Sequence, residues 1–98
     1  MAFKSFQSTS VTTETTVYTG PASTETTVIG LSVACTAASP ATVSVKLNSA
    51  YIVKDAPVPV GGALVAVGGE QKIVLEATDT LKVSSDQTVD VITSVLEI

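Results

Sequence analysis

The sequence predicts an all-β protein, a single small β-sandwich of jelly-roll or immunoglobulin-like type with an extended N-terminal arm. The chain has 98 residues, which is room for one domain, and its 45% hydrophobic content is too high for a disordered chain. It contains 16 Val, 15 Thr and 5 Ile, and such β-branched side chains favour pleated strands. Short apolar runs separated by turn residues recur at the spacing typical of sandwiches and small barrels.

The first 16 residues are predicted to form the arm, and residues 17–98 the sandwich domain. The arm is rich in Ser and Thr and has few large apolar groups, so we expect it to gain order only against a partner. Phe3 and Phe6 are its exceptions, since the chain has only two Phe, two Tyr and no Trp. Aromatic side chains are favoured anchors at interfaces. These two therefore either pack on the sandwich or dock on a neighbouring protein.

A short Thr-rich motif, TETTV, occurs at residues 13–17 and again at residues 24–28, with Gly20 and Pro21 between the copies. One interpretation is a strand, a turn and a second strand, because a Gly-Pro pair breaks regular structure. The other interpretation is low complexity without structural meaning. Both remain open from the sequence.

Alternation of apolar and polar residues first becomes clear at residues 28–35, which predicts a half-buried strand. Its inward face is expected to hold Ile29, Leu31, Val33 and Cys35. Residues 42–47 alternate in the same way, with the inward residues Val43, Val45 and Leu47. The two runs are predicted to form a hairpin. A single Cys without His is a poor metal ligand or nucleophile, so Cys35 is expected to be a small buried hydrophobic residue.

Turn residues divide the middle of the chain into short strands. Asn48 and Ser49 are predicted to turn the chain into a strand at residues 50–54. Proline cannot donate to a β-ladder, so Pro57 and Pro59 make residues 55–62 an edge strand or a crossing loop. Short strands are expected at residues 64–67 and 71–76, separated by a tight turn at Gly68 and Gly69.

The C-terminal segment ends in the most apolar strand of the chain. Leu81 and Val83 form an inward pair before it, and residues 89–98 are apolar on both faces. Val89, Val91 and Val95 lie on one face of this strand, and Ile92, Leu96 and Ile98 on the other. Such a strand is either central and covered on both faces or buried on its outer face by another subunit. The candidate partner-binding residues are therefore Phe3, Phe6, Ile92, Leu96 and Ile98.

The composition excludes most kinds of enzyme. The chain has no His, and its five basic residues are all Lys. His is the commonest general base and metal ligand, and Arg is the side chain that binds anions through two parallel hydrogen bonds. The chain has neither residue. The acidic residues Asp79, Asp86, Asp90 and Glu97 match no calcium loop and are expected to form a solvated rim. We expect no catalytic residues, no cofactor and no metal ion.

The charge balance indicates what the protein does not bind. Five Lys against nine acidic residues give a net charge of −4, which disfavours nucleic acid as a partner. No run is long enough to span a membrane and no targeting segment is visible, so we expect synthesis and assembly in a cytoplasm. Only 14% of the residues are charged, whereas the surface of a soluble monomer is about 25–35% charged. Part of the surface is therefore expected to be covered by protein partners or by further copies of the chain.

From residue 48 onward the order of features resembles small virion structural proteins of tailed bacteriophages. The segments that carry this resemblance are AYIVKDAPVP (50–59), QKIVLEATDTLKV (71–83), VDV (89–91), SVLEI (94–98) and, before them, VYTGP (17–21) leading to TVIGL (27–31). The similarity covers residues 17–98 and consists of strands and turns rather than reactive groups.

This resemblance implies a non-enzymatic structural protein of the virion, most often a head decoration (cement) protein that binds and stabilises the assembled capsid. Its main partner would be the major capsid protein, and a homo-oligomer is expected, with a trimer at a local threefold site favoured. The alternative is a neck, tail, baseplate or fibre component, including a receptor- or carbohydrate-binding module. Sugar sites usually stack rings on aromatic side chains, and only Tyr18 and Tyr51 are candidates, which counts against this alternative.

Overall fold

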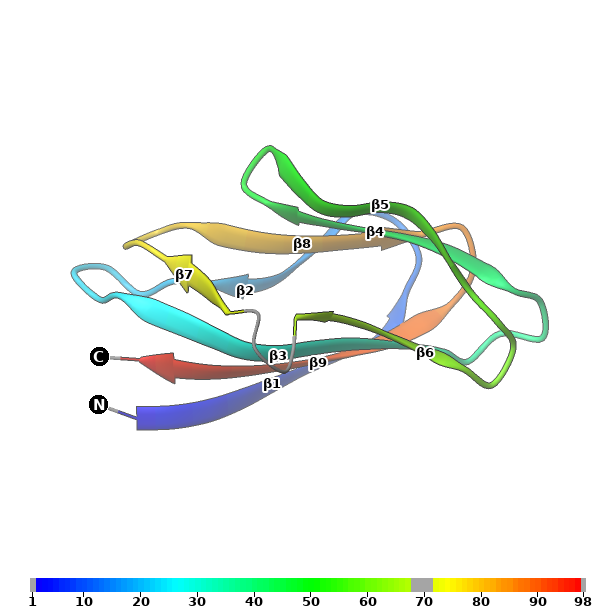
Figure 1. The fold of residues 1–98 in the computed structure, drawn as a ribbon, viewed down its shortest axis with the longest axis horizontal. Coiled ribbons are helices and arrows are strands. Elements are labelled where there is room, and N and C mark those ends of the chain that lie inside the picture. Colours follow the sequence, from blue (N-terminus) through cyan, green and yellow to red (C-terminus); the bar gives the residue numbers. More distant parts are fainter. Residues whose placement is uncertain (1, 68–71, 98) are drawn as a thin grey trace.

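A computed structural model describes residues 2–67 and 72–97, and in this part of the chain the protein is all-β without a helix. The strands form two antiparallel sheets that face one another across a shared core (Figure 1). The predicted all-β class is confirmed.

The first sheet has five strands in the part that the structure describes. Its order is β1 (Ala2–Val11), β9 (Val89–Glu97) and β3 (Thr26–Cys35), and the far side of β3 pairs with both β6 (Ala63–Val67) and β7 (Ile73–Leu75). The second sheet has four strands in the order β2 (Thr15–Thr19), β8 (Thr80–Ser85), β4 (Ala41–Leu47) and β5 (Ala50–Val58). The last strand of the chain, β9, is thus a central strand between β1 and β3.

The core lies between the sheets and is built mainly from valine and leucine. The five-stranded sheet contributes fully buried side chains such as Val28, Leu31, Val33, Val91 and Val95, and the four-stranded sheet contributes Val43, Val45, Leu81 and Val83. Most of these positions follow the alternation read from the sequence, because one face of each strand is turned inward. Cys35 is free and buried at the rim of the core, as predicted.

The strand β3 departs from simple alternation at one point. Its register with β9 shifts between Val28 and Gly30, and an extra residue in one strand of a pair turns the following side chains to the other face. Val28 is therefore fully buried, whereas Ile29 lies on the outer side with Phe3 and Ser94. The predicted inward position of Ile29 was wrong, while those of Leu31, Val33 and Cys35 are confirmed.

The predicted hairpin between residues 28–35 and 42–47 was also wrong. β3 belongs to the five-stranded sheet and β4 to the four-stranded sheet, so the chain crosses from one layer to the other between them. The next connection is the hairpin: β4 pairs with β5 across Asn48, whose φ is 53°, and Ser49. The two TETTV copies lie around the starts of β2 and β3, which belong to different sheets.

Two further expectations concern the middle of the chain. β5 is an edge strand that includes Pro57, which confirms the interpretation of this region as an edge. The predicted tight turn at Gly68 and Gly69 lies outside the described residues.

The N-terminal segment is an edge strand of the five-stranded sheet in this structure, rather than an arm that stands apart from the sandwich. β1 pairs with β9 from Ala2 opposite Glu97 to Val11 opposite Val89. Val11 is buried in the core, and the ring of Phe6 packs against Tyr18 with 5.0 Å between ring centroids. The backbone hydrogen bonds to β9, together with the contacts of Val11 and Phe6, order this polar segment against the sandwich.

Candidate functional site

The outer face of the five-stranded sheet is the most distinctive surface of the described chain. Residues paired across antiparallel strands point to the same face, so the registers define which side chains lie together. Three cross-strand rows make up what we call the uncharged face: Phe3, Leu96, Thr27 and Val74 in the first, Ser5, Ser94 and Gly30 in the second, and Gln7, Ile92, Ser32 and Val65 in the third. None of these residues carries a charge, and the acidic Asp90 lies beyond the third row, opposite Ala34.

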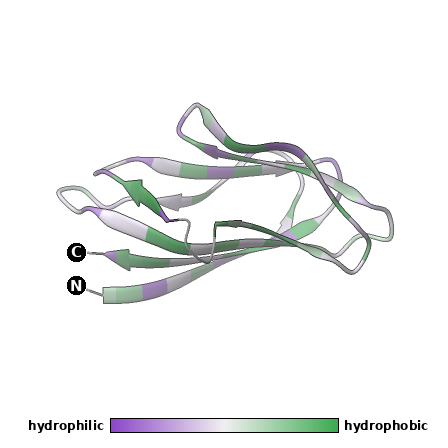
Figure 2. Ribbon diagram, viewed as in Figure 1, coloured by the Kyte–Doolittle hydropathy of each residue, from purple (hydrophilic) through white to green (hydrophobic). Residues whose placement is uncertain are grey.

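Large apolar side chains on this face are open to solvent. Phe3 is 73% exposed, Val65 66%, Val74 62% and Ile92 50%. A shallow hollow is lined in part by Phe3 and by Ile29, which the irregularity in β3 turns to this side. Figure 2 shows apolar ribbon along β9, β3, β6 and β7 and hydrophilic segments on β4, β5 and β8. Apolar side chains gathered on one flat face of a monomer mark a protein-protein contact more often than scattered ones do.

The structure brings together three of the five residues singled out from the sequence. Phe3 stands directly opposite Leu96, and Ile92 lies on the same face of β9 as Leu96. Phe6 is not part of this surface, because its ring turns inward against Tyr18. Ile98 lies outside the described residues.

Two exposed apolar side chains of the uncharged face were missed by the sequence analysis. Val65 and Val74 join it because β6 and β7 both pair with β3. Alternation in residues 71–76 does place Val74 on the outward side of its strand, but only the pairing shows that this side adjoins Ile92 and Phe3.

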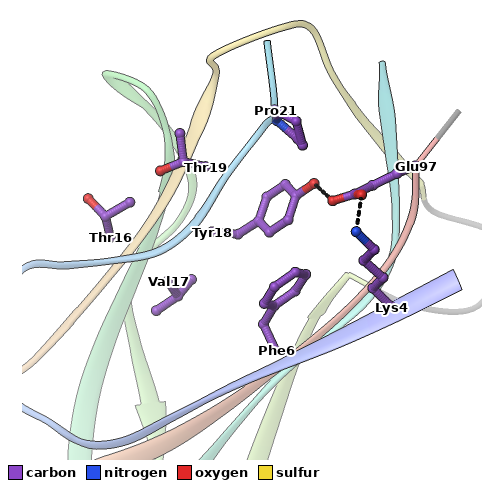
Figure 3. A pocket seen from close by; sticks show the side chains of 8 residues that line it. All are labelled: Lys4, Phe6, Thr16, Val17, Tyr18, Thr19, Pro21 and Glu97. Carbon is purple, nitrogen blue, oxygen red and sulfur yellow. Dashed lines mark hydrogen bonds and ion pairs between the residues drawn. The ribbon is translucent and has the colours of Figure 1, made fainter. Parts of the chain in front are cut away.

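A small polar cluster closes the sandwich at the open side between β1 and β2 (Figure 3). The Tyr18 hydroxyl donates to Glu97 Oε2 at 2.6 Å and lies 3.0 Å from Thr26 Oγ1, and Lys4 Nζ lies 2.8 Å from Glu97 Oε1. Phe6 covers the Tyr18 ring from β1. Every polar group here has a partner, so the cluster fastens β1 and β2 to β9.

Electrostatics of this cluster favour an ionised Glu97 and a protonated Tyr18. The Lys4 ammonium group and then the Tyr18 hydroxyl, both bonded to the carboxylate, hold the pKa of Glu97 below its ordinary value. Burial, together with the bond to Glu97, raises the pKa of Tyr18 above its ordinary value. A general acid or base needs a pKa near the working pH, and these shifts lead away from it, so the arrangement serves structure rather than proton transfer.

The outer face of the four-stranded sheet has the opposite character. Three of the five lysines gather there: Lys46 pairs with Lys82 on β8 and with Tyr51 on β5, and the ammonium groups of Lys46 and Lys54 lie 5.1 and 5.2 Å from the centroid of the Tyr51 ring. Glu14 forms an ion pair with Lys46 at 2.8 Å, which lowers the pKa of Glu14 and raises that of Lys46. The two outer faces therefore differ: three lysines gather on one, whereas the three rows of the other hold no charged residue.

Three of the four acidic residues expected to form a solvated rim accept hydrogen bonds from backbone amides at turns and strand ends. The expectation was wrong for the fourth, Glu97, which is buried and bonds to Tyr18 and Lys4. Asp79 accepts from the Glu76 amide, Asp86 Oδ1 from the Thr42 amide at 2.7 Å, and Asp90 from the Ser10 amide. Within residues 2–67 and 72–97, His, Cys, Asp and Glu form no group of three or more that suits a metal ion.

Comparisons with known proteins add no identity. No family model, curated protein or solved structure matches the chain. Among the residues that the structure describes, no helix has the length and apolarity needed to cross a membrane.

Proposed function

We propose that this protein is a non-enzymatic structural component of a tailed-bacteriophage virion, and that it acts as a decoration (cement) protein on the assembled head. The observation that carries the proposal is the uncharged face, where Phe3, Val65, Val74 and Ile92 are exposed together on one side of the molecule. Two facing antiparallel sheets support a β-sandwich of jelly-roll or immunoglobulin-like type as the scaffold.

The shape of this face favours a protein partner over a small molecule. Small ligands bind in concave sites that bury most of their surface, whereas this face is the side of a sheet with one shallow hollow. Because this face carries no charge, binding through it does not depend on charge attraction, which salt would screen. Binding to the major capsid protein through this face would leave the lysine-bearing face of the other sheet toward solvent.

A protein that binds the assembled shell and not the free shell subunit stabilises the shell by mass action. Each contact need not be strong, because many copies bind one shell. The expected contribution to the virus is therefore resistance of the head to heat and chelators, not an essential step in its assembly.

The second candidate is a neck, tail, baseplate or fibre component that binds a sugar or receptor. A sugar site usually needs an aromatic ring that is open for stacking, and Tyr18 and Tyr51 are the two candidates. Tyr18 is buried, and two lysine ammonium groups lie over the ring of Tyr51. Neither tyrosine offers an open ring for stacking, so we favour the protein-binding role.

The test compares two variants that each add one positive charge, Ile92→Lys on the uncharged face and Ser84→Lys on the outer side of β8. Binding to heads that lack the protein is titrated at low and high ionic strength. We expect Ile92→Lys to weaken binding by about tenfold or more, as at an interface centre, and Ser84→Lys to leave it unchanged.

Heads are then melted with and without the wild-type protein. A higher melting temperature of decorated heads and binding that survives high salt are expected. Equal melting temperatures of heads with and without the protein would rule out the cement role. Equal affinities of Ile92→Lys and Ser84→Lys would show that the uncharged face is not the binding surface.

A further inference from the structure

The sheets of this protein end in edge strands that differ in how well they are protected. An edge strand presents a row of unpaired backbone N–H and C=O groups, and natural proteins protect it with proline, charge, bulges or short length. On the four-stranded sheet, β5 carries Pro57, the pair Lys54 and Asp55 and two register shifts against β4. β2 is five residues long and also contains a register shift.

The five-stranded sheet has one protected side and one unprotected side in the described part of the chain. Along β3 the edge is divided between β6, with five residues, and β7, with three. β1 on the opposite side has ten residues and contains no Pro and no carboxylate. It pairs regularly with β9 from Ala2 to Ser8 and has one register shift, between Ser8 and Val11. Its one charged side chain, Lys4, bonds to Glu97 of the same sheet. Over residues 2–8, β1 is therefore a regular edge without proline, carboxylate or bulge.

We propose that β1 pairs in antiparallel fashion with β1 of a second copy of this chain, so that the two five-stranded sheets become one continuous sheet. The second copy is the partner that the strands indicate, because residues 2–8 of β1 form the longest regular edge among the described strands. A two-fold axis places this edge against the same edge of another copy. Closed two-fold dimers are also the commonest oligomers. No acidic residue lies on β1, so none of the carboxylates behind the net charge of −4 is on the strand that forms this contact.

Side chains limit the register of this pairing. Directly opposed residues in an antiparallel pair share a face, and like charges placed opposite one another destabilise it. A two-fold axis at Lys4 would oppose two ammonium groups. An axis at Ser5 places Lys4 beside Phe6 of the second copy and Phe3 beside Gln7, and an axis at Phe6 brings the two Phe6 rings together. The last two registers avoid the charge conflict.

The expected dimer is weak. A ten-residue strand is about 33 Å long, and pairing two such edges buries less than the area of about 1,200 Å² at which stable interfaces begin. Association is therefore expected to depend on concentration. The contact leaves the uncharged face of both copies free on one side of the joined sheet, so it is independent of the proposed function.

The experiment is sedimentation velocity of the full chain from about 1 µM to about 1 mM, with proline variants of β1. Adjacent residues in a strand point their N–H groups to opposite sides, so Gln7→Pro and Ser8→Pro differ in which ladder they interrupt. The variant that keeps the wild-type melting temperature is the one whose N–H faces away from β9. We expect wild type to shift from monomer to dimer, and that variant to stay monomeric.

Two lysine variants keep the test decisive if both proline variants melt lower. Ser5→Lys places two like charges near the axis and should abolish the dimer, whereas Ile92→Lys alters the uncharged face alone and should leave it intact. A wild type that stays monomeric throughout, a trimer as expected from the sequence, or a dimer that is lost in Ile92→Lys would each overturn the proposal.

Discussion

Removal of one hydroxyl group tests whether the polar cluster holds β1 and β2 against the core. Tyr18→Phe keeps the ring that packs on Phe6 and removes the hydroxyl group. This hydroxyl donates to Glu97 Oε2 at 2.6 Å and lies 3.0 Å from Thr26 Oγ1. Glu97 keeps its ion pair with Lys4, so the carboxylate is not left alone. Thr26 is 1% exposed and loses a partner for its hydroxyl.

The magnitude follows from these contacts. A hydrogen bond to a charged group contributes about 1.5–3 kcal/mol. The cluster borders a shallow pocket open to solvent, which reduces the contribution, so we expect a loss of about 1–2 kcal/mol in the free energy of unfolding. For a domain of this size that corresponds to a decrease of about 5–10 °C in melting temperature.

The assay is thermal unfolding at neutral pH with Tyr51→Phe as the matched control. Tyr51 is 49% exposed, so loss of its hydroxyl should change stability by less than about 0.5 kcal/mol. Hydrogen exchange adds a local readout, because weaker fastening of β1 should speed exchange of its amides. Equal melting temperatures for the two variants, with unchanged exchange in β1, would refute the structural role of the cluster.

Three further predictions concern single groups in the core and the cluster. Thr93→Val should raise the free energy of unfolding by about 1 kcal/mol, measured by denaturant titration, because Thr93 Oγ1 is buried without a hydrogen-bond partner in the described structure; a destabilised variant would contradict this. The folded-state pKa of Glu97 lies below its ordinary value of 4.5, so its contacts stabilise the fold above that pH and are lost as pH falls through the lowered pKa. The melting temperature of wild type should therefore decrease more steeply on acidification than that of Glu97→Gln. Parallel curves of melting temperature against pH would contradict a stabilising role of ionised Glu97. Cys35→Ala should cost about 1 kcal/mol or less and leave binding to heads intact, whereas a folded variant that no longer binds would show a chemical role for the thiol.

Alternation in the sequence was a reliable guide to which side chains face the core. Val43, Val45, Leu81 and Val83 are all fully buried, as predicted. It failed at Ile29, because an irregularity in pairing depends on the partner strand and leaves no mark in the alternation itself.

Partners of strands were harder to predict than the strands. Residues 28–35 and 42–47 follow one another in the chain but belong to different sheets, since alternation shows which face is buried and not which strand lies alongside. β1 was interpreted as an arm because its Ser- and Thr-rich sequence buries few side chains. Its order comes from contacts with distant residues, above all the ladder with β9 and the bond between Lys4 and Glu97.

The candidate site was predicted in part for the same reason. Ile92 and Leu96 were found because one strand was apolar on both faces, and Phe3 because aromatic residues are rare in this chain. Val65 and Val74 depend on how β6 and β7 pair with β3. A surface assembled from several strands is visible only once their order is known.

The most direct measurement is a cryo-EM map of a phage head that carries this protein, at a resolution that traces its strands. The account predicts that the uncharged face, with Phe3, Ile92, Val65 and Val74, lies against the capsid protein and that the face with Lys46 and Tyr51 lies toward solvent. A map in which the uncharged face points to solvent, or in which the protein is found only in the tail, would contradict it.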